Sequence, residues 1–410
     1  MARKEDVMIR RRRKVDPSDT AEPAASSESD RSSIRRYGKR RRTRRRWIRI
    51  LALAVTAILV ALIIANWDVT NPEYVWTWVR LQVTGGDVGD GFPREMEGNT
   101  VQDMEPVGRQ LAVVTDDYLL MYNKTAGETV RRPCSFANPA LSVAGKYALV
   151  AEIGGHRLRL ETVSRTQLEL ETPDAIVEAA VAEDGTIAVV VDSSSYQSEV
   201  WVYDRKGKVK YHWSSASTLV MGVDIRGNTM TLIGTNTSGG GLQSELLLMD
   251  ITSDVAPTRF PMTDTLFFAV ELLPNGKAFA IGDTGALLVD PKTQQSRPIT
   301  YESSRLLGYD VSENRLGLLL SSYGSADGGV LAVYNDSGDC VHTTPFSGNG
   351  RWIADDADGG FLVLTSSNLH YVKDGGESGV LGRYSDGLRV TCFEGQAIVL
   401  GLTRMEAVEY

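Results

Sequence analysis

The sequence predicts an all-β fold, a β-propeller with eight blades, preceded by one transmembrane helix and a disordered basic tail. Three observations carry the prediction. A tight-turn signal followed at once by an apolar strand recurs eight times, at intervals of 36 to 49 residues. Two further strands follow most of these signals. One uncharged apolar stretch lies ahead of the repeats, and a strongly basic segment precedes it.

The N-terminal segment, residues 1–46, is expected to be a disordered cytoplasmic tail. Residues 1–49 hold 18 Lys and Arg against seven Asp and Glu, while the whole chain has a net charge of −8. The rest of the chain is therefore acidic, with a net charge of −19. A low apolar content leaves the tail too little surface to bury. An acidic body also argues against nucleic acid as a partner, because phosphates need basic residues.

The apolar stretch Ile50–Ala65 carries no charge, and we assign a transmembrane helix to residues 47–67. A cleaved signal peptide is the alternative. It would require a much shorter N-terminal region and a small-residue cleavage site, and neither is present. The basic run Lys39–Arg46 precedes the span, so the N-terminus is predicted to be cytoplasmic and the C-terminal domain extracellular.

Residues 68–89 are predicted to form an aromatic juxtamembrane helix and a linker, starting at Asn71-Pro72. Tryptophan suits membrane interfaces and arginine reaches the headgroups. Packing of these aromatic side chains against the domain that follows is a compatible alternative. The residues expected to anchor the chain at the membrane are Arg45, Arg46, Trp47, Arg49, Trp67, Trp76 and Trp78.

The body, residues 90–410, contains the repeat. Glycine and asparagine accept the backbone of tight hairpin turns, so they mark the phase of each repeat. The eight markers are Gly108, Gly145, Gly185, Gly227, Gly276, Asn314, Gly359 and Gly395. A third strand, usually ending in Asn or Asp, follows each apolar strand, and a polar strand with proline and charge suits an exposed outer edge. Four strands at a period near 40 residues indicate a propeller.

The eighth repeat stops at Tyr410 after its third strand, so its outer strand must come from elsewhere. Gly91-Phe92-Pro93-Arg94 is similar to Arg259-Phe260-Pro261-Met262, an outer strand of another repeat. We therefore predict that residues 90–97 complete the last blade and close the ring. Seven blades remain the alternative if one marker lies in an irregular insert.

With these repeats, the chain resembles the broad propeller superfamily that includes quinoprotein-like and YVTN-type propellers. Its layout of basic tail, single span, aromatic flank and acidic propeller over about residues 31–410 resembles an uncharacterised family of Gram-positive bacterial membrane proteins, a domain of unknown function. The resemblance implies a fold and a membrane location but no activity. The Trp-Asp pairs of WD40 repeats, the sialidase box and the tryptophan motifs of quinone-dependent dehydrogenases are absent from the sequence.

Catalytic and cofactor motifs are missing from the sequence. The four histidines lie in different repeats without metal-ligand spacing, and no P-loop, HExxH or GxSxG motif occurs. The run Asp355-Asp356-Ala357-Asp358-Gly359 falls at an ordinary turn and lacks the first ligand of a calcium loop. We expect Cys134, Cys340 and Cys392 to be small buried residues. The sequence thus predicts no catalytic, cofactor-binding or metal site, and a protein that is not an enzyme.

Loop length is the most informative irregularity. The loop between the second and third strands is long in three repeats, at 192–199, 235–244 and 321–329. These loops are rich in Ser, Gly, Asn and Tyr, an adaptable contact surface, and propeller geometry brings them to one face. The candidate binding face comprises Asp192, Tyr196, Asn236 and Tyr323. Flexible insertions at tolerant positions are the alternative.

These features predict a membrane-anchored extracytoplasmic propeller that acts as a binding or scaffold module at the cell envelope. Its partner is expected to be an envelope protein or glycan, besides the membrane itself. A transmembrane sensor that couples the propeller to a cytoplasmic partner is one alternative, and an envelope enzyme of propeller type is another. The sequence identifies neither a ligand nor an oligomeric state.

Overall fold

A computed structural model describes residues 51, 56, 89–96, 100–237, 240–302, 304–312, 314–322, 328–356 and 359–410. The chain divides into two compact units, Met1–Val75 and Trp76–Tyr410, and all the named strands belong to the second. The predicted tail, span and linker lie outside the described residues, apart from Leu51 and Thr56, which are helical. Within the described ranges, no helix is long and apolar enough to cross a membrane.

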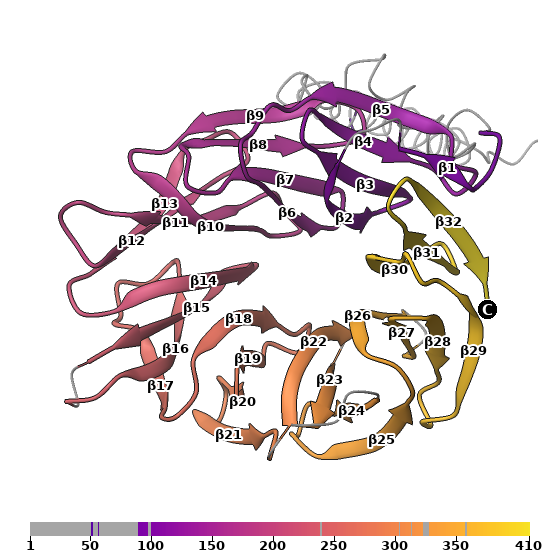
Figure 1. The fold of residues 1–410 in the computed structure, drawn as a ribbon. Coiled ribbons are helices and arrows are strands. Elements are labelled where there is room, and N and C mark those ends of the chain that lie inside the picture. Colours follow the sequence, from indigo (N-terminus) through magenta and orange to yellow (C-terminus); the bar gives the residue numbers. More distant parts are fainter. Residues whose placement is uncertain are drawn as a thin grey trace, which may run out of the picture. The chain divides into compact units, whose positions relative to one another are not determined.

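Eight four-stranded antiparallel sheets form a closed ring, the blades of a propeller (Figure 1). The prediction of eight blades is confirmed. The first four blades run from inner to outer strand as follows: β2 (Val101–Val107), β3 (Gln110–Thr115), β4 (Tyr118–Tyr122), β5 (Glu128–Pro133); β6 (Pro139–Ala144), β7 (Tyr147–Glu152), β8 (Arg157–Glu161), β9 (Thr166–Glu171); β10 (Ala175–Val181), β11 (Ile187–Asp192), β12 (Ser198–Tyr203), β13 (Val209–Ser215); β14 (Leu219–Arg226), β15 (Thr229–Asn236), β16 (Gln243–Asp250), β17 (Thr258–Met262).

The remaining blades follow the same order from the centre outwards. They are β18 (Phe267–Leu272), β19 (Ala278–Gly282), β20 (Gly285–Asp290), β21 (Gln295–Thr300); β22 (Ser304–Ser312), β23 (Arg315–Ser322), β24 (Gly329–Tyr334), β25 (Cys340–Phe346); β26 (Gly350–Asp355), β27 (Phe361–Thr365), β28 (Asn368–Val372), β29 (Ser378–Arg383); and β30 (Arg389–Phe393), β31 (Gln396–Leu400), β32 (Arg404–Glu409), β1 (Arg94–Glu95).

The last blade closes the ring as predicted. Its outer strand is β1, which pairs antiparallel with β32 through Arg94 opposite Met405 and Glu95 opposite Arg404. The Met96 N–H donates to the Thr403 carbonyl at 2.9 Å and extends the pairing. Figure 1 shows β1, from the start of the domain, beside the C-terminal strand. The first and last strands of the propeller thus share one sheet, which leaves no unpaired blade edge at the junction.

The burial pattern explains the order of strands within each blade. Second strands such as β3 and β7 are buried along their whole length, because neighbouring blades cover both of their faces. Outer strands are polar and exposed, as in β21, where only Ile299 is buried. The core is divided into eight clusters, and individual clusters join adjacent sheets, as when Val202 of one blade and Leu232 of the next belong to the same cluster.

The ring has two distinct faces. The turns between inner and second strands, and between third and outer strands, lie on one side, which we call the turn face. Antiparallel pairing puts the loops between second and third strands on the other side, together with the links between blades. We call this second side the loop face. The phase markers are confirmed at the turn face, where Gly108 and Gly227 have φ values of 58° and 59°.

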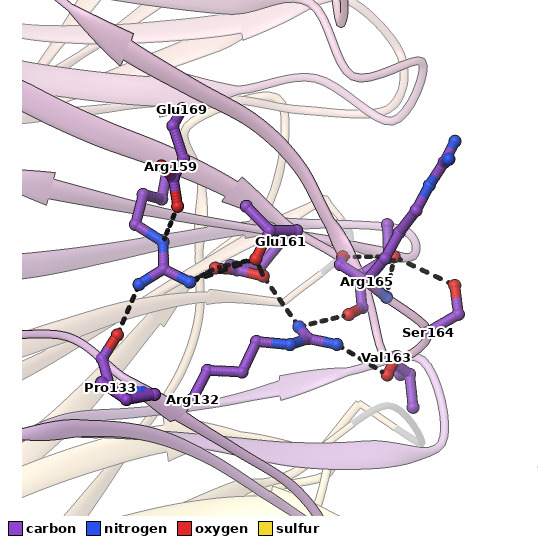
Figure 2. A network of polar contacts seen from close by, with 10 residues as sticks. Arg132, Pro133, Arg159, Glu161, Val163, Ser164, Arg165 and Glu169 are labelled. Atoms are coloured by element: carbon purple, nitrogen blue, oxygen red, sulfur yellow. Dashed lines mark hydrogen bonds and ion pairs between the residues drawn. The ribbon is translucent and has the colours of Figure 1, made fainter. Parts of the chain in front are cut away.

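An ion-pair network at the outer part of the ring ties the first two blades together (Figure 2). Glu161 is only 1% exposed, and its carboxylate accepts from Arg132 at 2.7 Å and from Arg159 at 2.5 Å. Arg132 comes from β5 of the first blade and also donates to the carbonyls of Thr162 and Val163. A buried carboxylate of this kind is tolerated because both of its oxygens are paired.

The cysteine prediction is correct for one residue only. Cys134 is buried, whereas Cys340 is exposed and Cys392 is partly exposed. Cys340 is the first residue of β25, an outer strand, and lies where the pairing with β24 shifts register. The apolar character of a cysteine therefore did not determine its burial here, because the position in the blade did.

Candidate functional site

The inner strands bring one residue per blade to the same level of the central channel. This residue is the third paired position counted from the turn that joins the inner and second strands, and we call the set the channel ring. In the third, fifth and seventh blades the first pair is the hydrogen-bonded pair Ala182–Thr186, Leu273–Lys277 or Asp356–Gly360. Its members are Glu105, Ser142, Ala180, Asp224, Glu271, Asp310, Ala354 and Thr391. Four of the eight are carboxylic acids, a concentration of like charge that needs an explanation.

Part of the channel ring has a structural role. Asp224 accepts the Leu272 N–H of the next blade at 2.6 Å, and Asp310 accepts the Asp355 N–H of its next blade at 2.7 Å. Ser142 accepts the Val181 N–H in the same way at 3.2 Å. The second, fourth and sixth blades therefore each bind the inner strand of the blade that follows. These bonds account for Asp224 and Asp310 as inter-blade contacts.

The fourth junction of this pattern is different. Thr391 of the last blade stands where the other acceptors stand, and the residue facing it in register is Pro106 of the first blade. Proline has no N–H, so this junction has no backbone donor to accept. The neighbouring residue, Glu105, is left without a structural bond of this kind.

Glu105 and Glu271 are the unexplained members of the channel ring. They belong to the first and fifth blades, which are opposite each other in a ring of eight. Among the described residues neither carboxylate has a hydrogen-bond or ion-pair partner, although Asp224 and Asp310 do. Burial, followed by the charges of Asp310, Asp103 and Asp355, raises the pKa of Glu105 to about 8. Burial and then the charges of Asp224, Asp310 and Glu105 raise the pKa of Glu271 well above its usual value.

The pKa values of the two aspartates in the channel ring are also raised. Burial and the Asp355 charge raise the pKa of Asp310 to about 7, although two backbone N–H donors oppose the shift. Burial also raises the pKa of Asp224. Such shifts are typical of groups held together by a fold for binding or catalysis rather than for stability.

One cation of the chain already occupies the channel. Arg389, at the start of β30, donates from Nη1 to Asp103 at 2.6 Å, and its guanidinium lies 4.6 Å from the centre of the Trp352 ring. Arg389 and Trp352 border a cavity of about 80 Å³, with Glu105, Asp310 and Asp355 also in its wall. The cavity shows that a guanidinium, a carboxylate and an aromatic face fit together at this level.

An aromatic wall leads from the loop face down to the ring. Phe268 is 48% exposed at the loop-face end of β18, and its ring centre lies 6.1 Å from that of Tyr309 in the next blade. Burial, followed by the charges of Glu271 and Asp310, raises the pKa of Tyr309, so its hydroxyl is within the electrostatic influence of the channel carboxylates. Phe268 sits at a register shift of the inner strand, an irregularity that recurs in six blades and frees its side chain from regular pairing.

Exposed apolar side chains gather on the loop face around this entrance. Elsewhere in the described residues they are scattered on outer strands and on turn-face loops. Those of the loop face are Tyr196, Leu219, Leu242, Leu266, Phe268, Leu388 and Leu402. Five of the seven belong to the third, fourth and fifth blades, on the same side of the ring as Glu271. We call these five the apolar rim: Tyr196, Leu219, Leu242, Leu266 and Phe268.

The predicted binding-face residues divide between three environments. Asp192 and Tyr196 are exposed on the loop face, at the long loop between β11 and β12. Asn236 is buried, and its side chain hydrogen-bonds the Glu245 carboxylate, so it is not part of the exposed face. Tyr323 and the membrane-anchoring residues Arg45, Arg46, Trp47, Arg49, Trp67, Trp76 and Trp78 lie outside the described residues.

The channel ring was missed in the sequence, although its signal is present. Glu105, Ser142 and Asp224 each stand three residues before a marker glycine, in inner strands that read as unremarkable. A longer turn moves Glu271 out of this spacing, and Asp310 leaves it because its marker, Asn314, is the second residue of the turn. Register, which the fold supplies, was needed to align them. Within the described ranges, no group of three or more His, Cys, Asp or Glu is arranged to hold a metal ion.

A family model described as a family of unknown function, DUF5711, matches residues 87–400. The chain belongs to this family. The expected kinship to a propeller domain of unknown function is thereby confirmed, while the bacterial group and the membrane location stay predictions. No curated protein matches the chain.

Solved structures with a similar fold share little sequence with the chain. Hsv2p of Kluyveromyces lactis is 11% identical with a TM-score of 0.48, over 70% of this chain and 99% of that one. Apo AztD of Citrobacter koseri is 13% identical with a TM-score of 0.48, over 68% of this chain and 84% of that one. The WD40 domain of Pan2 from Neurospora crassa is 16% identical with a TM-score of 0.41, over 53% and 71%.

Proposed function

We propose that this protein is a non-catalytic binding module, anchored in the cell membrane by residues 47–67 and displaying its propeller outside the cell. The apolar rim is the observation that supports a binding role most directly. Exposed apolar side chains that share one face of a domain are a typical mark of a binding surface, and the rim lies beside the long loops predicted to recognise a partner. Ser, Gly and Tyr in those loops suit an envelope protein or glycan as the partner.

The experiment places a photoreactive diazirine side chain at Leu242 of the full-length chain in its own membrane. The matched control is Val255, an equally apolar and exposed residue of the same blade on the turn face. We expect one adduct from position 242, none from 255, and loss of the adduct when Leu266→Ser and Phe268→Ser are added. Equal labelling at both positions would contradict a partner on the loop face.

An exposed cysteine can be used to test whether the propeller lies outside the cell. Cys340 is an exposed thiol of the propeller, and Cys134 is buried. A membrane-impermeant maleimide added to intact cells at pH 8 should label the wild-type chain, and Cys340→Ser together with Cys392→Ser, at the partly exposed cysteine, should remove that label. Labelling that occurs only after the cells are broken would place the propeller inside and refute the proposed topology.

The alternative of a sensor is distinguished by the cytoplasmic tail. Deleting residues 1–30 while keeping the basic run before the span should leave a binding module fully functional. Loss of function at a normal membrane level would favour the sensor. An enzyme is the second alternative, and the channel carboxylates would be its acid and base. Abolished turnover of an envelope substrate in Glu105→Gln, with binding retained, would favour it.

A further inference from the structure

The apolar rim and the channel ring belong to one route. Along β18, three residues separate Phe268 at the rim from Glu271 in the ring, a depth of about 10 Å in an extended strand. Tyr309 of the neighbouring blade contacts Phe268 and precedes Asp310 of the channel ring in β22. It is influenced by the charges of Glu271 and Asp310. A side chain that enters from the loop face therefore passes an aromatic surface before it reaches the carboxylates.

The chemistry along this route changes from apolar to anionic. Lys and Arg have the matching order, since an apolar stem carries a charged head. Their cations are also attracted to aromatic faces. At the end of the route, Glu105 and Glu271 are enclosed by protein and open to the channel, and neither has a partner among the described residues. Arg389 and Arg226 act on these two carboxylates only as the smallest of the charges around them, and neither pairs with them directly. The channel thus offers two carboxylates without a direct ion-pair partner and a wall suited to a long basic side chain.

Arg389 gives an internal precedent for this mode of binding. Its guanidinium is held by the Asp103 carboxylate and stacks on Trp352 within the same channel. The Arg389 guanidinium lies across the channel from Glu271 and does not neutralise the charge on that side. The side of the ring that bears the apolar rim is therefore the side where negative charge is left over.

We infer that the partner of the loop face is a peptide segment in which a Lys or Arg lies between apolar residues. The basic side chain enters the channel and binds between Glu271 and Glu105, while its apolar neighbours cover Phe268, Leu266 and Leu219. This inference rests on the proposed binding function and specifies the chemistry of the partner. It is argued from charge complementarity with the channel and from the position of the rim at its mouth.

The test uses the full-length chain in detergent micelles and two short peptides, acetyl-Phe-Lys-Phe-amide and acetyl-Phe-norleucine-Phe-amide. Norleucine keeps the stem of lysine and removes the charge. We expect calorimetry to show binding of the lysine peptide at least about tenfold tighter than the norleucine peptide. Glu271→Gln and Glu105→Gln should each remove most of this difference, and Glu169→Gln, an exposed residue of an outer strand, should not.

Proton release on binding is a readout that would not change if Glu105 had only a structural role. Because the pKa of Glu105 is raised to about 8, this group carries a proton at pH 7, and an incoming cation should expel it. Heats of binding in Tris and in phosphate should therefore differ by an amount that Glu105→Gln reduces, and the proton released from Glu271 should account for the remainder. Each variant is first compared with the wild type by thermal unfolding, so that a loss of binding is not a loss of fold.

The outcomes separate the two proposals. Equal affinity for both peptides, unchanged affinity in the Glu271→Gln and Glu105→Gln variants, or no binding of either peptide at millimolar concentration would overturn the basic-segment inference. A rim adduct at Leu242 that persists beside any of these results would keep the loop face as a binding surface and exclude the channel. If the Phe268→Ser variant loses the Leu242 adduct and also no longer binds the lysine peptide, the result supports both the loop-face proposal and the basic-segment inference.

Discussion

Two groups of enclosed carboxylates in this protein have opposite electrostatic surroundings. In the outer part of the ring, Glu152 and Glu245 meet arginines. Hydrogen bonds from Arg157 lower the pKa of Glu152 below its usual value. Burial opposes the same shift at Glu245, but hydrogen bonds from Thr218, Asn236 and Arg259 prevail and lower its pKa. In the channel, burial and like charge raise the pKa of Glu105 and Glu271.

The difference shows which carboxylates hold the blades together and which are free to act. A paired buried charge stabilises the fold, because removing its partner leaves an uncompensated charge. An unpaired group at raised pKa costs stability at neutral pH, and such a cost is typical of functional sites. The outer acids thus belong to the scaffold, and Glu105 and Glu271 to the site.

The largest expected effect is at the outer network of Figure 2. Glu161→Ala should destabilise the protein by about 3–5 kcal/mol, because Arg132 and Arg159 would stay enclosed without their shared carboxylate. Urea unfolding measures the change. Glu169→Ala, at a carboxylate 68% exposed and paired with the same Arg159, is the control and should change stability by less than about 0.5 kcal/mol. Similar losses in the two variants would contradict the role assigned to Glu161.

The second prediction concerns the dependence of stability on pH. Glu105 and Asp310 have raised pKa values, about 8 and about 7, so the folded state binds protons more strongly than the unfolded state. Their contribution to stability is fully present below about pH 4 and is lost as pH rises through 7 to 8. Glu152 and Glu245, with lowered pKa values, contribute above pH 4.5 and lose this as pH falls. The unfolding free energy should therefore be greatest between about pH 4.5 and 7. A maximum above pH 8 would refute the channel assignment.

The third prediction is a substitution at an enclosed residue that should raise, rather than lower, the stability of the protein. Glu105→Gln should stabilise the protein by about 1–2 kcal/mol at pH 8.5, because it removes a charge that lies among other carboxylates. At pH 5 the wild-type group is already protonated in the folded state, and the two proteins should unfold alike. Chemical unfolding at both pH values measures the difference. A loss of stability at pH 8.5 would mean that the Glu105 carboxylate has a stabilising partner.

The smallest expected effect is at the inter-blade contacts. Ser142→Ala removes the acceptor of the Val181 N–H and should cost about 1 kcal/mol at any pH from 5 to 9. Thr391→Ala, at the junction where Pro106 offers no N–H, is the matched control and should cost less. Hydrogen exchange of the Val181 amide gives a direct readout, since faster exchange is expected in Ser142→Ala alone. No difference in exchange would remove the structural role of Ser142.

Much of the fold could be predicted from the sequence because its signals are local. Turn glycines such as Gly108 and Gly227 require a left-handed backbone, and the apolar run that follows each of them is a strand buried on both faces. Ring closure was predicted from the likeness of residues 91–94 to another outer strand, and β1 confirms it. The loop face was also predicted, and Tyr196 is exposed there.

What the sequence by itself determined is the repeat, and with it the eight blades, their strand order and the closure of the last one. These follow from backbone conformation and hydrophobic pattern, which act over a few residues. Only the tertiary structure decided which carboxylates meet. Glu105 and Glu271 are 166 positions apart in the sequence and face each other because the ring places the first and fifth blades in opposition. Charge interactions depend on distance in space, so no local pattern could reveal them.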